Sequence, residues 1–422
     1  MVPLRRHWGD PGLRRLAAGV RLGLVIFVIR TDYAVFEYFA GNYVWNMAVN
    51  HAIVSGARIG EIDQMCRPLV EAAKAEGNDE SATAAFLAAW CTVADRLVQQ
   101  AKVDEEAGHL ISAGEKLGRA STYYLTAERM QRPGAAGRQD LYRKVIDTFR
   151  RSVEFERENC EFVEIPYSAN GRETSFPGLF VRGEGDGPRP CVVEFNGLDS
   201  TKEMVYGNGL AQKLAKRGIS TLIMDHPGSG EALRLRGMTG SYQSEKYGGA
   251  GLDYLASRDD CDAGRCGVVG WSLGGYYAPR AAAFESRFKA CVAWGAIYSW
   301  PELGAYRQES GQGTEPSVPH FAEHIAWVFG LKTPEDFPPF AATMSMAEHS
   351  HRITMPFLVI HGSNDRQIPA LFAQKQYDAA VNSSRRELHI VTPEEGGVEH
   401  VGFDNPTFTT SYIADWLAET LV

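Results

Sequence analysis

A serine between two glycines stands at the end of an apolar run. The segment CGVVGWSLGGYYA, residues 266–278, reads as a buried strand, a Gly-x-Ser-x-Gly turn and the start of a helix. Such a turn forces the hydroxyl of Ser272 out of the sheet, and Gly270 and Gly274 carry no side chains that would collide there. The helix N-terminus offers free backbone N–H groups to a developing negative charge. GxSxG alone occurs by chance in many sequences, but the strand before it and the helix after it predict a serine nucleophile.

An acid and a histidine follow this serine in an order that suits catalysis. Asp365 ends the apolar run MPFLVIHGSND, and His400 lies in GGVEHVGF before the last helical segment. Ser272 would attack a carbonyl carbon, His400 would carry its proton to the leaving group, and Asp365 would orient His400. The alternatives are structural, with Asp365 capping the following helix and His400 serving as a loop residue. His361 and His389 lie in or beside predicted strands, where a structural role is favoured.

Two backbone amides are expected to hold the oxyanion that forms during such an attack. One is the amide of Leu273, directly after the nucleophile. The other should come from the loop Asn196-Gly197-Leu198-Asp199, which ends the strand CVVEFNG. We expect the amide of Leu198 to be the donor, with that of Asp199 as the alternative.

Four side chains are candidates for the wall of the substrate pocket. Trp271 adjoins the nucleophile, and Asp199 belongs to the oxyanion loop. His226 and Glu231 belong to the turn DHPGSGE, residues 225–231, which also follows a strand. For most residues of that turn, a structural role as a glycine-rich turn held by Asp225 is the alternative.

Other motifs for metals and cofactors are weaker. The segment HFAEH, residues 320–324, matches the HxxEH pattern of zinc-dependent proteases, but no third ligand is evident, so no metal site is predicted. Neither GxGxxG nor GxxxxGK[ST] occurs in the chain. We therefore expect no cofactor.

Strands and helices alternate from residue 156 onward. Six β-rich apolar runs are separated by helical stretches, which indicates an α/β fold with a mostly parallel sheet and helices on both faces. The runs are CVVEFNG, ISTLIMDHPG, CGVVGWSLGG, FKACVAWGA, MPFLVIHGSND and RELHIVTP, and the helical stretches are 202–218, 244–258 and 371–381. A long stretch between two of the strands, about residues 301–350, contains the short helical segment FAEHIAWVFG and is expected to be a lid-like insertion.

Residues 35–155 are helical in pattern, without strands or a dense set of chemical groups. Apolar residues recur every three or four positions in segments 61–77, 80–103 and 112–131. We therefore predict a helical domain at 1–155 and a catalytic domain at 156–422. The apolar stretch 22–29 is far shorter than the roughly 18 residues that span a membrane, so a buried or amphipathic helix is favoured over a signal peptide.

Composition restricts the partners. The chain has 422 residues, 43 basic and 52 acidic side chains, and a formal charge of −9, without long Lys/Arg runs, which excludes nucleic acid and anionic membranes as main partners. Hydrophobic residues make up 44% of the chain, which excludes disorder. Seven cysteines without a CxxC pair favour a reducing compartment, and the expected location is cytoplasmic. The partner should be a small molecule; a homodimer is one arrangement left open.

With these residues in place, the sequence resembles the α/β-hydrolase superfamily from residue 156 onward. The motifs that carry the resemblance are NGLDSTKE, DHPGSGEA, GWSLGGYYAPR and HGSNDRQIP. They are most similar to the branch with the fungal pigment-pathway polyketide-shortening hydrolase and bacterial 2,6-dihydroxypseudooxynicotine hydrolase. SAGEKLGRASTYYLTAERM, residues 112–130, extends the likeness into the N-terminal half. The chain departs from the branch at Asn196, where glycine is usual, and at His226.

The resemblance implies an α/β-hydrolase fold in which the N-terminal helices cap the active site. It implies that Ser272, Asp365 and His400 form the triad, that Leu198 and Leu273 supply the oxyanion donors, and that the reaction splits a carbon–carbon bond next to a ketone. Esters would undergo the same steps with an easier leaving group, so a carboxylester hydrolase or thioesterase is the nearest alternative. An acyltransferase or cyclase shares the covalent intermediate. A non-catalytic interaction protein with an inactive hydrolase core is the alternative from another class.

Overall fold

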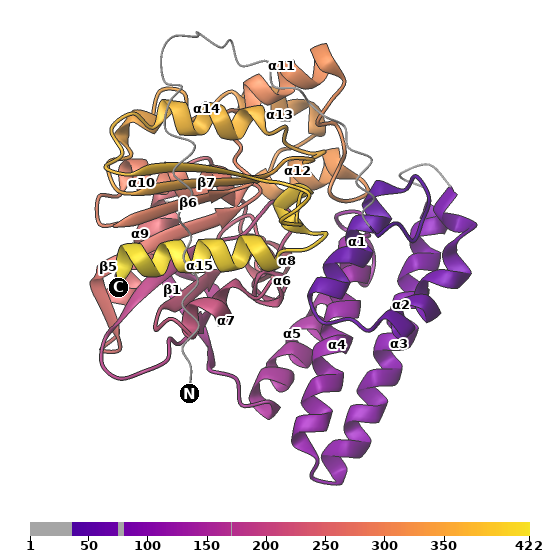
Figure 1. Ribbon diagram of the computed structural model, residues 1–422. Coiled ribbons are helices and arrows are strands. Elements are labelled where there is room, and N and C mark those ends of the chain that lie inside the picture. Colours follow the sequence, from indigo (N-terminus) through magenta and orange to yellow (C-terminus); the bar gives the residue numbers. More distant parts are fainter. Residues whose placement is uncertain (1–35, 75–79, 170) are drawn as a thin grey trace, which may run out of the picture. The chain divides into compact units, whose positions relative to one another are not determined.

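The computed structural model describes residues 36–74, 80–169 and 171–422. The chain begins there with an N-terminal helical region, which we define as α1–α5 and which is drawn in indigo and violet in Figure 1. Its helices are α1 Tyr43–Val54, α2 Ile59–Cys66, α3 Glu80–Glu106, α4 Leu110–Arg129 and α5 Arg138–Phe155. The helix expected around residues 22–29 lies outside the described residues.

Two of the three helices predicted in this region are confirmed, and one is shorter than expected. α3 covers the predicted segment 80–103, and α4 covers residues 112–129 of the predicted segment 112–131. The segment 61–77 is not one helix, because α2 ends at Cys66 and gives way to the 3₁₀ turns Arg67–Leu69 and Ala72–Lys74. Pro68 lacks the backbone N–H that a continuing helix needs, which explains the break.

An eight-stranded sheet follows the helical region. Its order is β1-β2-β4-β3-β5-β6-β7-β8; β1, β2 and β4 pair antiparallel, and the pairs from β4–β3 to β7–β8 are parallel. The six predicted strands are all present, as β3 Arg189–Phe195, β4 Ser220–Met224, β5 Cys261–Trp271, β6 Ala290–Trp294, β7 Phe357–Gly362 and β8 Arg386–Val391. The hairpin of β1 Cys160–Ala169 and β2 Arg172–Val181 was not predicted. β1 alternates polar and apolar residues, and β2 begins with three exposed residues before its buried half, so neither strand is a continuous apolar run.

Helices cover both faces of the sheet, as predicted. Alternate residues of each central strand enter two different cores; Val192 of β3, for example, belongs to one and Val193 to the other. α7 Leu210–Ala215 and α15 Thr407–Leu421 pack with the first core, and α9 Glu245–Ala256, α10 Gly274–Phe284 and α14 Leu371–Ala379 pack with the second. Figure 1 shows α14 and α15 on opposite faces of the strands.

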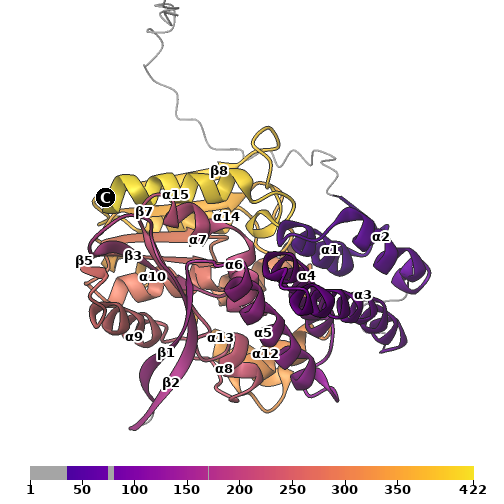
Figure 2. The same cartoon turned by 90° about the horizontal axis from the view of Figure 1, so that it is seen from below.

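The predicted helix at 202–218 is divided into α6 Lys202–Gly207 and α7. Gly209, with a φ of 86°, adopts a left-handed conformation between them. α6 lies beside α5 of the helical region in both views (Figures 1 and 2), and the rings of Phe149 and Tyr206 meet there with centroids 5.5 Å apart. α6 therefore connects the helical region to the loop that follows β3.

The stretch expected to be an insertion contains three helices between β6 and β7. They are α11 Trp300–Ser310, α12 Phe321–Phe329 and α13 Phe337–Ala341, with 3₁₀ turns at Pro334–Asp336 and Ser350–Arg352. The five-residue α8, Gly230–Arg234, follows β4. Across the described ranges, none of the helices has the length and apolarity needed to cross a bilayer.

Candidate active site

Ser272 occupies the sharp turn between β5 and α10 that the sequence predicts. Its φ is 57°, in the left-handed region that is unusual for a serine, and its amide donates to the carbonyl of Trp294 at 2.9 Å. A Cβ on Gly270 would lie 2.2 Å from the carbonyl oxygen of Gly274, and a Cβ on Gly274 would lie 2.7 Å from that of Phe195. Both glycines are therefore required for the backbone to fold back under the nucleophile.

The structure brings the three predicted triad residues together. Nε2 of His400 lies 2.8 Å from Oγ of Ser272, and Nδ1 of His400 lies 2.8 Å from Oδ2 of Asp365. Asp365 stands in the loop after β7, and His400 opens the 3₁₀ turn His400–Gly402 before α15. In this geometry the imidazole can take the serine proton while the carboxylate supports the imidazolium that forms.

The surroundings of Asp365 keep it ionised. Its Oδ1 accepts hydrogen bonds from the amides of Gln367 at 2.9 Å and Ile368 at 2.8 Å, and Nε2 of His361 lies 3.2 Å from its Oδ2. Burial by itself would raise the pKa of Asp365, but the interactions with His400 and His361 outweigh burial and hold that pKa well below its usual range. His361 thus has the structural role that its strand position predicts.

The two predicted oxyanion donors lie against the nucleophile. Leu273 directly precedes α10, where helix N–H groups lack partners within the helix. The loop of Leu198 is equally close, because a Cβ on its neighbour Gly197 would lie 3.2 Å from Cβ of Ser272. Within the described part of the chain, neither Leu198 nor Leu273 donates its amide hydrogen to another protein group. Both amides can therefore receive an alkoxide.

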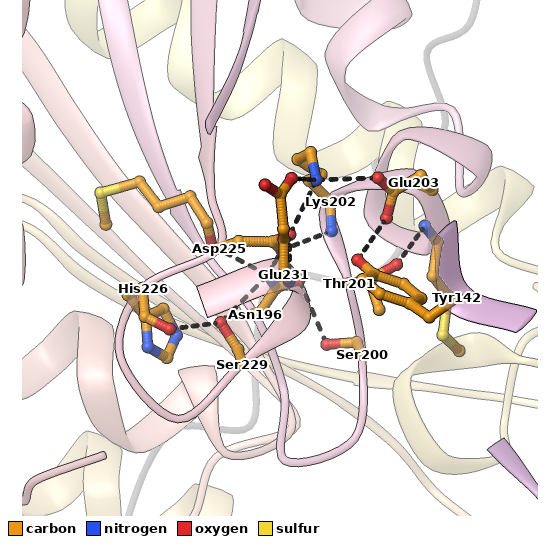
Figure 3. Close-up of polar contacts among 12 residues, drawn as sticks. Tyr142, Asn196, Ser200, Thr201, Lys202, Glu203, Asp225, His226, Ser229 and Glu231 are labelled. Carbon is orange, nitrogen blue, oxygen red and sulfur yellow. Dashed lines mark hydrogen bonds and ion pairs between the residues drawn. The ribbon is translucent and has the colours of Figure 1, made fainter. Parts of the chain in front are cut away.

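A buried lysine ties the oxyanion loop to the next strand end (Figure 3). Nζ of Lys202 lies 2.8 Å from Glu203, 3.0 Å from Asp225 and 3.0 Å from Glu231. Burial would lower the pKa of Lys202, but these carboxylates raise it above its usual range, so Lys202 stays charged. Asn196, the departure from the usual glycine, joins the same network by donating to Asp225 at 2.9 Å.

The turn 225–231 is structural in part, as the alternative interpretation held. Oδ2 of Asp225 accepts from the amide of Glu231 at 2.8 Å, and Gly230 has a φ of 45°. A Cβ on Gly230 would fall about 1.9 Å from the Asp225 carboxyl group, so only glycine fits.

A small space opens in front of Ser272. It has a volume of about 20 Å³, room for about one water molecule. Its wall combines residues of the helical region with residues from the part of the chain that forms the sheet. The lining residues are Met47, His51, Arg129, Gly197, Asp199, Ser200, Met204, Trp271, Ser272, Ser317, Gln367, His400 and Val401. Asp199 and Trp271 lie where the pocket prediction places them, and the insertion contributes Ser317.

The other two candidate pocket residues lie elsewhere. The ring of His226 is buried and stacks on Tyr247 with centroids 5.5 Å apart, and burial lowers its pKa to about 4. Glu231 bridges Lys202 and Arg236, each at 3.0 Å. Neither lines the space at Ser272. Both follow the end of β4, but the chain turns back at Gly228 and Gly230, which directs these side chains away from the nucleophile.

A larger chamber of about 340 Å³ adjoins this space. We call it the chamber; its wall combines α1, α4 and α5 with α6 and α7. His51, Arg129 and Met204 line both volumes and therefore lie between them; we call these three residues the neck. Hydroxyl and carboxylate groups are frequent on the chamber wall: Ser55, Ser121, Thr122, Thr126, Ser152, Tyr206, Glu156, Glu158 and Glu203.

The HxxEH segment does not form a metal centre with further ligands. His324 is buried in α12, and burial lowers its pKa to about 3. Among the residues with assigned positions, no group of three or more His, Cys, Asp or Glu side chains could hold a metal ion.

Two family models match the chain, each over about half of its length. The model described as the prolyl oligopeptidase family matches residues 208–420, and the one described as esterase FrsA-like matches residues 84–300. The chain belongs to the α/β-hydrolase family. The second match begins in α3, so the relationship includes part of the helical region of this hydrolase.

Similar proteins include hydrolases from bacteria and fungi. The 2,6-dihydropseudooxynicotine hydrolase of Paenarthrobacter nicotinovorans is 27% identical over 79% of this chain and 84% of its own length. Hydrolase phmG of Phaeosphaeria nodorum is 30% identical over 51% of this chain and 52% of its own length, so the match spans about half of that relative. The crystal structure of 2,6-dihydroxy-pseudo-oxynicotine hydrolase shares the fold, with a TM-score of 0.70 and 24% identity over 88% of this chain and 95% of that one.

Several residues that line the space at Ser272 were not predicted. Met47, His51 and Arg129 come from α1 and α4, a region in which the sequence indicates only helices. His51 is buried, and burial together with Arg129 lowers its pKa to about 3, so it is neutral. A lone histidine or arginine on an amphipathic helix carries no signal for a site, because only tertiary packing decides which face turns inward.

Proposed function

We propose that this serine hydrolase cleaves a carbon–carbon bond next to a ketone, in a β-dicarbonyl or aryl ketone of polyketide type, without a cofactor. In this proposal Ser272, His400 and Asp365 form the catalytic triad, and the amides of Leu198 and Leu273 form the oxyanion hole. The helical region acts as a cap that selects the substrate. The 2.8 Å contacts of His400 with Ser272 and Asp365 support the first assignment.

The chemistry follows from these positions. Oγ of Ser272 adds to the ketone carbon while His400 takes the serine proton, and the two amides hold the alkoxide. Collapse of the adduct breaks the carbon–carbon bond; the electron pair leaves with the departing carbon as an enolate, and His400 returns the proton to it. Water then hydrolyses the acyl-serine. A β-diketone and one water thus give a carboxylic acid and a ketone.

The chamber is the observation that carries the choice of substrate. A lipid would suit a wholly apolar groove, whereas the wall formed by the helical region carries hydroxyl and carboxylate groups among its apolar side chains. Such a wall suits an oxygen-rich molecule whose body occupies the chamber while one carbonyl reaches Ser272. The similarity to a 2,6-dihydropseudooxynicotine hydrolase supports the same choice.

Entry of a carbonyl group into a space of about 20 Å³ requires side chains to move. Met47 and Met204 line that space, and methionine has three rotatable bonds and adapts readily to neighbouring groups. We expect these two side chains to rotate when the substrate binds.

The test compares benzoylacetone with a series of nitrophenyl esters, with products identified by mass spectrometry. The wild type should convert the diketone to a carboxylic acid and a ketone, and Ser272→Ala should abolish this. Ser257→Ala, at an exposed serine of the same domain, is the matched control and should keep full activity. Ester cleavage without diketone cleavage would establish the carboxylester hydrolase instead, and failure of a fluorophosphonate to label Ser272 would contradict the nucleophile.

A further inference from the structure

A cluster of buried charges lies between α4 and the oxyanion loop. Nη2 of Arg129 donates to the carboxylate of Asp199, and Glu128 accepts from Nε of Arg138 at 2.7 Å and Nε of Arg234 at 2.9 Å. Each of the five side chains is buried. Three guanidinium groups therefore face two carboxylates, and one positive charge is not matched within this cluster.

Arg129 is the member of the cluster that reaches the substrate space. It lines both the chamber and the space at Ser272, and its side chain is only 3% exposed. Its Nε–H has no hydrogen-bond partner among the described residues. A buried donor without a partner destabilises the protein, and a substrate oxygen at the neck would remove that cost. His51, the other polar neck residue, is neutral and adds no second charge.

The charge of Arg129 and its unpartnered N–H limit which substrate group Arg129 can bind. Asp199 already neutralises much of the guanidinium charge, and its carboxylate would repel a second fixed anion. A carboxylate or phosphate also prefers two parallel N–H groups, whereas Nε–H is the one buried nitrogen of Arg129 without a hydrogen-bond partner among the described residues. This arrangement favours an oxygen that is neutral in the substrate and gains negative charge during the reaction.

We propose that Arg129 binds the second carbonyl oxygen of a β-dicarbonyl substrate and stabilises the enolate that leaves when the carbon–carbon bond breaks. This inference rests on the proposed function. Ser272 and the two loop amides act on the first carbonyl, and Arg129 acts on the oxygen that receives the electron pair of the broken bond. His400 then protonates the enolate carbon, so the fragment leaves as a neutral ketone and the guanidinium keeps its proton throughout.

The first test compares two reactions that need Arg129 to different extents. Arg129→Met alone leaves Asp199 charged and unpaired, so the double variant Arg129→Met/Asp199→Asn is used. It should lower kcat/KM for benzoylacetone by about 100-fold, the loss that follows removal of one oxyanion donor. Hydrolysis of nitrophenyl acetate should change less than about five-fold, because nitrophenolate needs no enolate stabilisation.

The matched control removes the ion pair of Glu128 and Arg138 in the same cluster. Glu128 and Arg138 are buried but line neither volume, so Glu128→Gln/Arg138→Met should leave the ratio of the two activities unchanged. Equal losses on both substrates in the Arg129 double variant would overturn the inference, as would no loss on the diketone.

A binding measurement separates this inference from the proposed function. In Ser272→Ala, which should bind benzoylacetone without cleaving it, adding Arg129→Met/Asp199→Asn should raise the Kd of benzoylacetone in calorimetry by about ten-fold, because the contact with the second carbonyl is lost. A wild type that cleaves only esters would contradict carbon–carbon cleavage, and the Kd comparison would still decide whether Arg129 binds that carbonyl. A Kd that did not change without Arg129 would overturn its role.

Discussion

The two walls of the active site differ in how they are built. On the sheet side, Ser272, Asp365 and His400 stand at three loops after strands, and each lies in a short recognisable motif. On the helical side, Met47, His51 and Arg129 come from the middle or end of two helices without any motif. Loop geometry at a strand end depends on a few adjacent residues, whereas the inward face of a helix depends on its packing. The proposed catalytic residues are thus encoded locally, whereas the residues that face them from the helical region are placed by tertiary structure.

The largest effect should come from the sheet side. Asp365→Asn removes the carboxylate that holds His400 in its working orientation, and kcat should fall by about 10⁴-fold for diketone and ester alike. The fold should persist, which circular dichroism can verify. A variant that lost activity on only one substrate class would show that Asp365 acts in selection, and the contrast between the two walls would fail.

The second prediction concerns Lys202 in α6, the helix that connects the helical region to the oxyanion loop. Lys202→Met leaves three carboxylates without their shared cation and should destabilise the protein by about 3–5 kcal/mol in urea denaturation. The control is Lys289→Met, at an exposed lysine after α10, which should change stability by less than about 0.5 kcal/mol. If Lys202→Met were as stable as the control, the oxyanion loop would not depend on this network.

Filling the chamber should alter selection without altering chemistry. Thr122 lines the chamber, and Thr122→Trp should lower kcat/KM for a bulky aryl diketone by about ten-fold, or about 1.4 kcal/mol, through KM. Turnover of nitrophenyl acetate should stay within two-fold. Thr92→Trp is a close control, because Thr92 is exposed on α3 and bonds the carbonyl four residues earlier, as Thr122 does on α4. If Thr122→Trp and Thr92→Trp lowered kcat/KM for the diketone equally, the chamber would not be the binding site for the substrate.

The smallest effect concerns a buried acid in the strand that leads to the oxyanion loop. Burial raises the pKa of Glu194 in β3 to about 8, above its ordinary value of 4.5. The folded state therefore holds this proton more tightly, and stability is lost as pH rises from about 4.5 through 8. Glu194→Gln should match the wild type near pH 5 and exceed its Tm by about 2–4 °C at pH 9. If the Tm difference did not grow with pH, the pKa of Glu194 in the folded protein would not be raised.

The predictable part of the molecule follows this same division. β3 to β7 could be predicted because buried parallel strands contain continuous runs of apolar residues, and Ser272, Asp365 and His400 could be predicted because each follows a strand of the sheet. β1 and β2 could not be predicted, because they are partly exposed. The single helix expected at 202–218 is divided into two near Gly207 and Gly209. His226 was wrongly predicted to line the pocket, because a residue that follows a strand can point to either side of the sheet edge. Arg129 gave no signal, since its buried partner Asp199 lies 70 residues away in the chain.

The size of the space at Ser272 also bears on what attacks the acyl-serine. The free protein has about 20 Å³ there, room for about one water molecule. An alcohol or amine of several carbons would need side chains to move before it could reach the acyl-serine, whereas water would not. We therefore expect hydrolysis to have an advantage over transfer to a bulky alcohol, and an alcohol series of increasing size would measure that advantage.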